Sequence, residues 1–141
     1  MPSLEDVARG LIGRPFGHRG RGPEAFDCWG LVMEVYRQTF GIELPDYAAD
    51  GSRTHRAAAA ALVDGERGAW IELSPSVERP GDVILLRRFG RPLHLGLVMG
   101  RRRFLHCDEP AGVTCQPYDS MAWRNQVLGC YRHPTLASRT S

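Results

Sequence analysis

Cys28 follows a loop rich in glycine, proline and arginine and precedes an apolar stretch with helical periodicity. This order predicts that Asp27 caps a helix and that Cys28 is its first residue. A cysteine in that place faces unpaired backbone N–H groups and the positive end of the helix dipole. Both favour the thiolate, which is the reactive form. We therefore expect a nucleophile with a pKa well below the free-thiol value of about 8.5.

Two histidines in the second half of the chain are candidates for the base. His94 shares one face of a predicted strand with Gly96 and Val98, while leucines occupy the other face. His106 lies on the next predicted strand, and a hairpin turn at 100–103 places it on the same sheet face as His94. An imidazole that takes a thiol proton needs a partner on its other ring nitrogen. His106 can be that partner, although each histidine alone also fits a structural role in a strand.

Helices are expected in the first half of the chain. Ser3 caps an apolar stripe over Leu4–Ile12, and a wider apolar face follows Cys28 until Gly41 ends the helix. A short alanine-rich helix is expected over His55–Val63. Residues 48–79 carry no chemical motif, so we interpret them as a packing element with loops.

Strands are expected from residue 80 onward, after a short strand at 70–73. The predicted strands are Val83–Leu86, Leu93–Met99, Phe104–Cys107, Val113–Gln116 and Val127–Tyr131. Helices followed by an antiparallel meander indicate a single α+β domain over residues 1–141. Residues 133–141 are expected to be a frayed tail.

Composition excludes several classes of function. The formal charge is +2, which is too small to indicate a nucleic-acid partner, and all 18 basic residues are arginines. Arg101–Arg103 are expected at a solvated turn. No apolar run approaches the roughly 20 residues of a membrane span.

The four cysteines do not form a metal-binding pattern. No CxxC pair is present, so we expect no metal and no cofactor. Cys107, Cys115 and Cys130 lie in apolar strand contexts and are expected to be buried free thiols. A mixed site that combines Cys107 with the histidines is disfavoured, because Cys107 points to the opposite face from His106.

Four short motifs, in this order, resemble those of the NlpC-type cysteine peptidases. Asp27–Leu31 is similar to their nucleophile motif, Pro80–Val83 to their Pro-Gly-Asp entry into the central strand, and His94–Gly100 to their histidine strand. Phe104–His106 resembles the following strand, which carries the third catalytic residue. One such motif is weak support, whereas four in sequence are specific.

The resemblance implies a papain-like α+β fold, with N-terminal helices packed on a central antiparallel β-sheet. It implies a Cys-His-His site in which Cys28 is the nucleophile, His94 the base and His106 the orienting residue. Members of this family mostly hydrolyse amide bonds of bacterial cell-wall peptides. The implied substrate is therefore a peptidoglycan peptide, with a backbone N–H donor to the oxyanion and a covalent acyl-enzyme.

Two departures from the family pattern concern the surroundings of the cysteine. Trp29 replaces the usual small serine, which predicts a bulkier rim. Phe16 stands where the family often has a tyrosine whose hydroxyl lies near the cysteine, and His18 or Arg19 could supply a polar group instead. Phe16, His18, Asp27 and Trp29 are accordingly the residues expected around the substrate.

The motif Asp-Cys-Trp-Gly-Leu in a short chain resembles the members carried on phage tails or tail-like particles. No signal peptide or wall-binding repeat is recognisable in the sequence. The expectation is a chain made in the cytoplasm and carried to the cell wall as part of a virion tail. Tail hub or tip proteins are then its expected partners.

Two other functions fit the same residues. The missing tyrosine and the bulky Trp29 also suit an inactive structural or adaptor subunit of a tail tip that retains the peptidase fold. A papain-like site also supports acyl transfer to or from a lipid or an amine. An activity assay separates the first alternative from a peptidase, and the masses of the products separate the second.

Overall fold

The helices lie mainly in the first half of the chain and the strands in the second, as predicted. The computed structural model describes residues 1–47, 54–64, 70–88 and 91–139. In chain order the elements are α1 (Leu4–Leu11), α2 (Cys28–Phe40), α3 (Thr54–Asp64), β1 (Ile71–Glu72), β2 (Val83–Arg88), β3 (Arg91–Gly100), β4 (Arg103–Asp108), β5 (Gly112–Pro117), β6 (Val127–Arg132) and α4 (Pro134–Arg139). None of the helices in these ranges is long and apolar enough to cross a bilayer.

The predicted helix caps are present. The Ser3 side chain accepts a hydrogen bond from the Asp6 N–H at 3.1 Å, and the Asp27 carboxylate accepts one from the Gly30 N–H at 2.6 Å. The left-handed conformation of Gly41 ends α2. These caps place Cys28 in the first position of a helix that is buried along most of its length.

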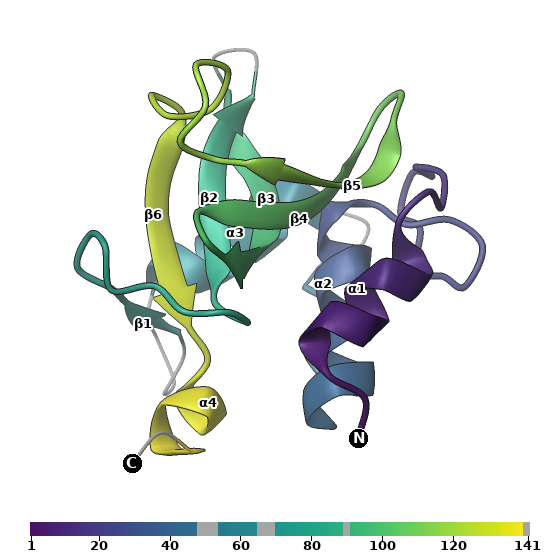
Figure 1. The fold of residues 1–141 in the computed structure, drawn as a ribbon, viewed down its shortest axis with the longest axis horizontal. Coiled ribbons are helices and arrows are strands. Elements are labelled where there is room, and N and C mark those ends of the chain that lie inside the picture. Colours follow the sequence, from purple (N-terminus) through teal and green to yellow (C-terminus); the bar gives the residue numbers. More distant parts are fainter. Residues whose placement is uncertain (48–53, 65–69, 89–90, 140–141) are drawn as a thin grey trace.

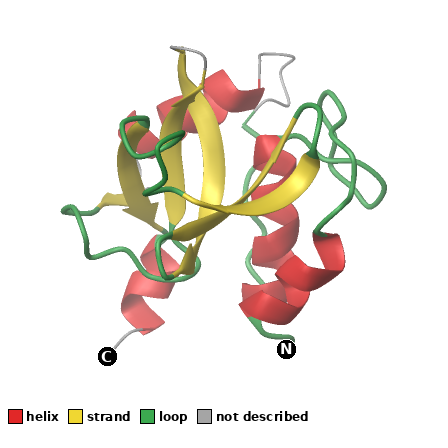
Figure 2. Cartoon of the chain, turned by 45° about the horizontal axis from the view of Figure 1, so that its top comes forward, coloured by secondary structure: helices red, strands yellow, loops and turns green. Residues whose placement is uncertain are grey.

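The strands form one antiparallel sheet in the order β1-β6-β2-β3-β4-β5 within the described residues. The strands curve, and α1 and α2 stand side by side next to them (Figures 1 and 2). β4 and β5 extend toward these two helices. The Gly13 N–H donates to the Val113 carbonyl and the Val113 N–H donates to the Arg14 carbonyl, which joins the residues after α1 to β5.

The two faces of the sheet bury different side chains. Leu95, Leu97 and Met99 of β3 join the larger core, which the helices cover. Val98 belongs to a second cluster on the opposite face, with residues of β2, β4 and the segment before β6. The predicted alternation along this strand is therefore confirmed, and His94 lies in the row of side chains that points away from the leucines.

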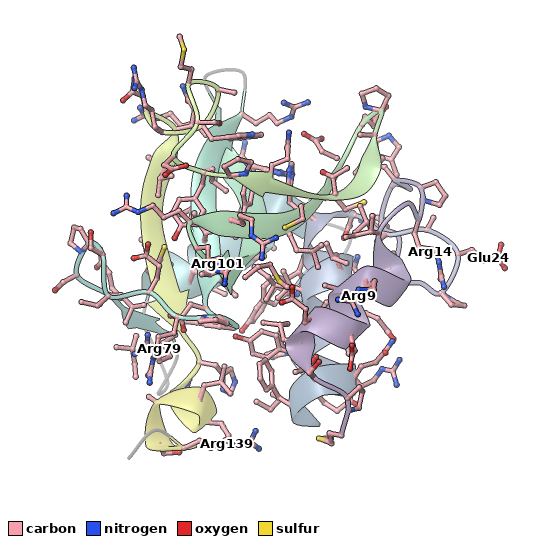
Figure 3. The ribbon with its side chains drawn as sticks, in the orientation of Figure 1. Arg9, Arg14, Glu24, Arg79, Arg101 and Arg139 are labelled. Atoms are coloured by element: carbon pink, nitrogen blue, oxygen red, sulfur yellow. The ribbon has the colours of Figure 1, made fainter. Side chains whose placement is uncertain are left out.

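Charged side chains mark the outside of the molecule. Arg9 projects from α1, and Arg14 and Glu24 project from the loop between α1 and α2 (Figure 3). Arg101 and Arg102 are exposed in the turn between β3 and β4, as predicted, whereas Arg103 begins β4 and is half-buried.

The carboxyl end of the chain corrects one expectation. Residues 134–139 form the short helix α4 rather than a frayed tail. Leu136 packs against the larger core, and the Ala137 N–H donates to the His133 carbonyl at 3.1 Å. The prediction missed this helix because two adjacent apolar residues in six, Leu136 and Ala137, give no periodic pattern.

The Pro-Gly-Asp motif ties two neighbouring strands together. Asp82 is 1% exposed and accepts two hydrogen bonds from the Arg132 guanidinium, at 2.9 and 2.8 Å. The Tyr36 hydroxyl donates to the Gly81 carbonyl at 2.5 Å. This motif therefore joins the start of β2 to the end of β6 and to the middle of α2.

Candidate active site

The loop before α2 holds Cys28 against the sheet. Its backbone pairs with itself through hydrogen bonds from Phe26 N–H to Pro15 C=O and from Gly17 N–H to Phe26 C=O. The next residue, Asp27, donates from its N–H to the Gly20 carbonyl at 3.1 Å. A Cβ atom at Gly30 would lie 1.9 Å from that same carbonyl oxygen. The loop therefore lies directly on the first turn of α2.

The thiol of Cys28 lies next to β3. Its sulfur accepts hydrogen bonds from the backbone N–H groups of Leu95 and Trp29, and both bonds lower its pKa. Leu95 directly follows His94, so the sulfur lies beside the strand position of the candidate base. Burial raises the thiol pKa by more, with a further contribution from Asp27, so that it reaches about 12. The expectation of a lowered thiol pKa is therefore wrong for the resting site.

Arg21 neutralises the carboxylate that caps the helix. Its guanidinium Nη1 lies 2.9 Å from each carboxylate oxygen of Asp27, and Nη2 lies 2.8 Å from Asp46. Asp27 is 5% exposed, and a carboxylate at that depth needs a partner. Arg21 thereby joins the loop, the helix start and the segment after α2.

The two histidines meet across β3 and β4. His94 Nε2 lies 2.8 Å from His106 Nδ1, and both side chains are 4% exposed. The line continues to β5, because His106 Nε2 lies 2.6 Å from the Oε1 atom of Gln116. The predicted hairpin geometry brings the histidines together, whereas Gln116 had no recognised signal in the sequence.

Gly96 provides the space for this pair. A Cβ atom there would lie 2.8 Å from the Leu105 carbonyl oxygen, 2.8 Å from the Phe104 ring and 3.2 Å from His106 Cβ. Two of these distances are shorter than side chains tolerate, and one of them is to rigid backbone. A side chain at position 96 would therefore push β4 and its histidine away from β3.

Aromatic rings enclose the histidines. Trp123 stacks on His94 with ring centroids 5.8 Å apart, and Phe104 stacks on His106 at 4.2 Å. Trp123 also meets the edge of His106, at 5.5 Å. The sequence indicated only packing for Trp123, and the structure shows that the candidate base His94 is one of its packing partners.

This enclosure keeps His106 neutral. Burial lowers its pKa to about 4, with the nearby Arg88 charge acting in the same direction and the Gln116 hydrogen bond opposing both. His106 is therefore an uncharged hydrogen-bonding partner near neutral pH. A cavity of about 500 Å³ borders it, between the turn at 109–112 and Trp123, with Arg87 and Gln116 on its wall.

The four residues expected around the substrate lie in different environments. His18 is exposed, and Phe16 is half-buried with its ring against that of His18, at 5.4 Å. Asp27 caps α2, as described above. Trp29 is 0% exposed, packs on Tyr47 and donates from its indole to the Pro45 carbonyl at 3.0 Å. The expectation of a bulky rim at Trp29 is therefore wrong, because this ring points into the core.

The other cysteines are free thiols away from the histidine pair. Cys107 donates from its sulfur to the Phe26 carbonyl at 3.1 Å, on the helix-covered side of the sheet. Cys130 is buried in the second cluster, and Cys115 is half-buried. Within the described part of the chain, no group of three or more histidine, cysteine or acidic side chains could hold a metal ion.

A cysteine that starts a helix, packed on an antiparallel sheet with two bonded histidines, is the arrangement of an NlpC-type domain. The chain belongs to the NlpC/P60 family, whose model matches residues 13–132. The fold agrees with a solved NLP/P60 family structure from Staphylococcus aureus, with a TM-score of 0.68 and 26% identity over 92% of this chain and 40% of that one.

Curated relatives are similar in sequence over much of this chain. The gamma-DL-glutamyl hydrolase of Bacillus subtilis is 30% identical over 96% of the chain and 30% of its own length. The murein DD-endopeptidase/murein LD-carboxypeptidase MepS of Escherichia coli is 24% identical over 76% of the chain and 49% of its own length. The chain thus spans less than half the length of each of these relatives.

One short match has higher identity. The tail tip assembly protein K of Escherichia phage N15 is 57% identical over 42 residues, which are 28% of this chain and 14% of that protein.

Proposed function

We propose that this chain is a cysteine hydrolase that cleaves amide bonds in peptides of the bacterial cell wall. Cys28 is the nucleophile, His94 the general base and then the general acid, and His106 the residue that orients His94. The observation that carries the proposal is the 2.8 Å contact between the two buried imidazoles, beside the strand position whose N–H bonds the thiol.

In the first half of the reaction, the thiol proton passes to His94 as the sulfur attacks the amide carbonyl carbon. Because the resting thiol is protonated, proton transfer and attack take place together rather than from a preformed thiolate. The carbonyl oxygen becomes an oxyanion that accepts from the Cys28 backbone N–H. His94 then protonates the departing amine, which leaves a thioester on Cys28.

In the second half, His94 takes a proton from water as the water oxygen attacks the thioester carbonyl. The carbon–sulfur bond breaks, the proton returns to the sulfur, and a carboxylic acid is released. His106 stays neutral throughout, because burial keeps its pKa near 4. It therefore supports the transient imidazolium of His94 as a hydrogen-bond acceptor.

The names of two relatives support the proposed substrate class. One relative is named a murein endopeptidase and carboxypeptidase, and another a gamma-DL-glutamyl hydrolase. The short match to a tail tip assembly protein supports a place in a phage tail or tail-like particle, with hub or tip proteins as partners.

An adaptor role without turnover is the second candidate. It is favoured by the raised pKa of the Cys28 thiol and by the low exposure of that side chain, 8%. If this second candidate is correct, the folded chain should bind a tail hub protein and release no product.

The deciding experiment is incubation of the purified chain with muropeptides, with products identified by mass spectrometry. Cys28→Ala should lower turnover by at least about a thousandfold, because it removes the nucleophile. Cys130→Ala removes a thiol from β6 and should keep wild-type turnover. Undiminished hydrolysis by Cys28→Ala would rule out the nucleophile, and a folded wild-type chain without turnover would favour the adaptor role.

A further inference from the structure

Gln116 is the third side chain in the line that starts at His94. It lies on β5, two residues after Thr114, which pairs directly with His106 in the β4–β5 register. Its Oε1 atom is 2.6 Å from His106 Nε2, whereas the Thr114 hydroxyl is 3.5 Å from the same nitrogen. Gln116 is therefore the stronger of the two partners.

The proton positions along this line follow from the amide oxygen. An amide oxygen only accepts, so His106 Nε2 carries its hydrogen toward Gln116. A neutral imidazole has one N–H, so His106 Nδ1 has a lone pair and accepts from His94 Nε2. By the same rule, His94 Nδ1 then has no hydrogen.

That pattern leaves His94 in the form that a base needs. A neutral imidazole accepts a proton only at the ring nitrogen without hydrogen, and its other nitrogen is already committed to His106. With an amide N–H facing His106 instead, every donor in the line would reverse. His94 Nδ1 would then carry a hydrogen and could not take the thiol proton.

We propose that Gln116 is a positioning residue that fixes the tautomers of His106 and His94, so that His94 Nδ1 carries no hydrogen and its lone pair can receive the proton of Cys28. This role rests on the proposed function of His94 as the base. Gln116 acts through the two histidines. Its exposed position on the wall of the 500 Å³ cavity distinguishes it from the buried imidazoles that it controls.

Heteronuclear NMR of the histidine side chains tests the tautomers without any substrate. In the wild-type chain, both rings should carry the hydrogen on Nε2. Gln116→Met keeps the length of the side chain but removes the acceptor, so the Nδ1–H form should appear at both rings. Gln116→Glu, which can only accept when ionised, should keep the wild-type tautomers.

Kinetics on muropeptides test the consequence for the base. Gln116→Met should lower kcat/KM at least about tenfold, because part of the enzyme holds the wrong tautomer. Gln116→Glu should retain kcat/KM within about threefold near neutral pH. Its acid limb should move to higher pH, because a carboxylate beside His106 raises the pKa of that ring. Thr114→Val removes the weaker partner of the same nitrogen and should lower kcat/KM less than Gln116→Met does.

Two results would overturn the proposal. One is a wild-type chain whose histidines carry the hydrogen on Nδ1, and the other is Gln116→Met with wild-type tautomers and wild-type kcat/KM. If the wild-type chain hydrolyses no wall peptide, the proposed function fails, while the NMR comparison still decides whether Gln116 sets the tautomers.

Discussion

Two buried aspartates in this molecule are held in nearly the same way. Asp27 and Asp82 are 5% and 1% exposed, and each accepts a backbone N–H as well as two bonds from one arginine. The arginines are Arg21 for the first and Arg132 for the second. One pair fixes the start of α2, and the other fixes the start of β2.

The difference between the pairs is what lies beside them. Asp27 directly precedes Cys28, and its charge helps to raise the pKa of that thiol. Asp82 has the same effect on the pKa of the buried Tyr36 hydroxyl, which has no part in the proposed reaction. The Arg132–Asp82 pair thus serves packing alone. In the Arg21–Asp27 pair, the arginine also limits how far the carboxylate raises the pKa of the Cys28 thiol, the proposed nucleophile.

Breaking the Arg132–Asp82 pair should give the largest loss of stability. Arg132→Met leaves Asp82 as an unpaired buried charge, and we expect the free energy of unfolding to fall by about 3 kcal/mol. Urea unfolding measures this loss. Alkylation of Cys28 under native conditions should keep its wild-type rate, and a changed rate would show that the two pairs are coupled.

Breaking the Arg21–Asp27 pair should lower stability by less and should change the pKa of the Cys28 thiol. Arg21 is partly exposed, so we expect Arg21→Met to lower the free energy of unfolding by about 1–2 kcal/mol. The uncompensated charge of Asp27 should raise the thiol pKa further. Iodoacetamide should then alkylate Cys28 roughly three- to tenfold more slowly, as measured on the Cys28 peptide by mass spectrometry. An unchanged rate would show that Arg21 does not affect the pKa of the Cys28 thiol.

Removing the charge of Asp27 should have the smallest effect on stability and the opposite effect on the thiol. Asparagine is as good a helix cap as aspartate, so Asp27→Asn should change the free energy of unfolding by less than about 1 kcal/mol. Because the wild-type pKa is about 12, the wild-type alkylation rate should keep rising through about pH 9. In the variant this rise should begin at lower pH, and a slower reaction would contradict the electrostatic explanation.

Most of the fold could be predicted because its signals are local. Caps at Ser3 and Asp27, helical periodicity after Cys28 and alternation around His94 each depend on a few neighbouring residues. The helix α4 has no such signal and is held by the contact of Leu136 with a distant core.

The site was predictable only in part, because some of its contacts are not local in sequence. The pairing of His94 with His106 follows from one hairpin, which the sequence shows. Arg21 and Gln116 are polar residues in a loop and on an edge strand, and only the folded chain brings them to Asp27 and His106. Trp29 was misplaced because adjacency in sequence to a nucleophile does not tell on which side of the helix a ring lies.

The contact between the Gly20 carbonyl and Gly30 has a consequence for redesign of this domain. A segment grafted into the loop at 14–26 has to preserve this contact. A Cβ atom at position 30 would lie 1.9 Å from the Gly20 carbonyl oxygen, so position 30 has to stay glycine unless the loop backbone at position 20 changes with it. A grafted loop whose backbone approaches α2 at another point would lose its contact with the first turn. The Cys28 thiol would then lose its fixed position, whatever side chains the graft carries.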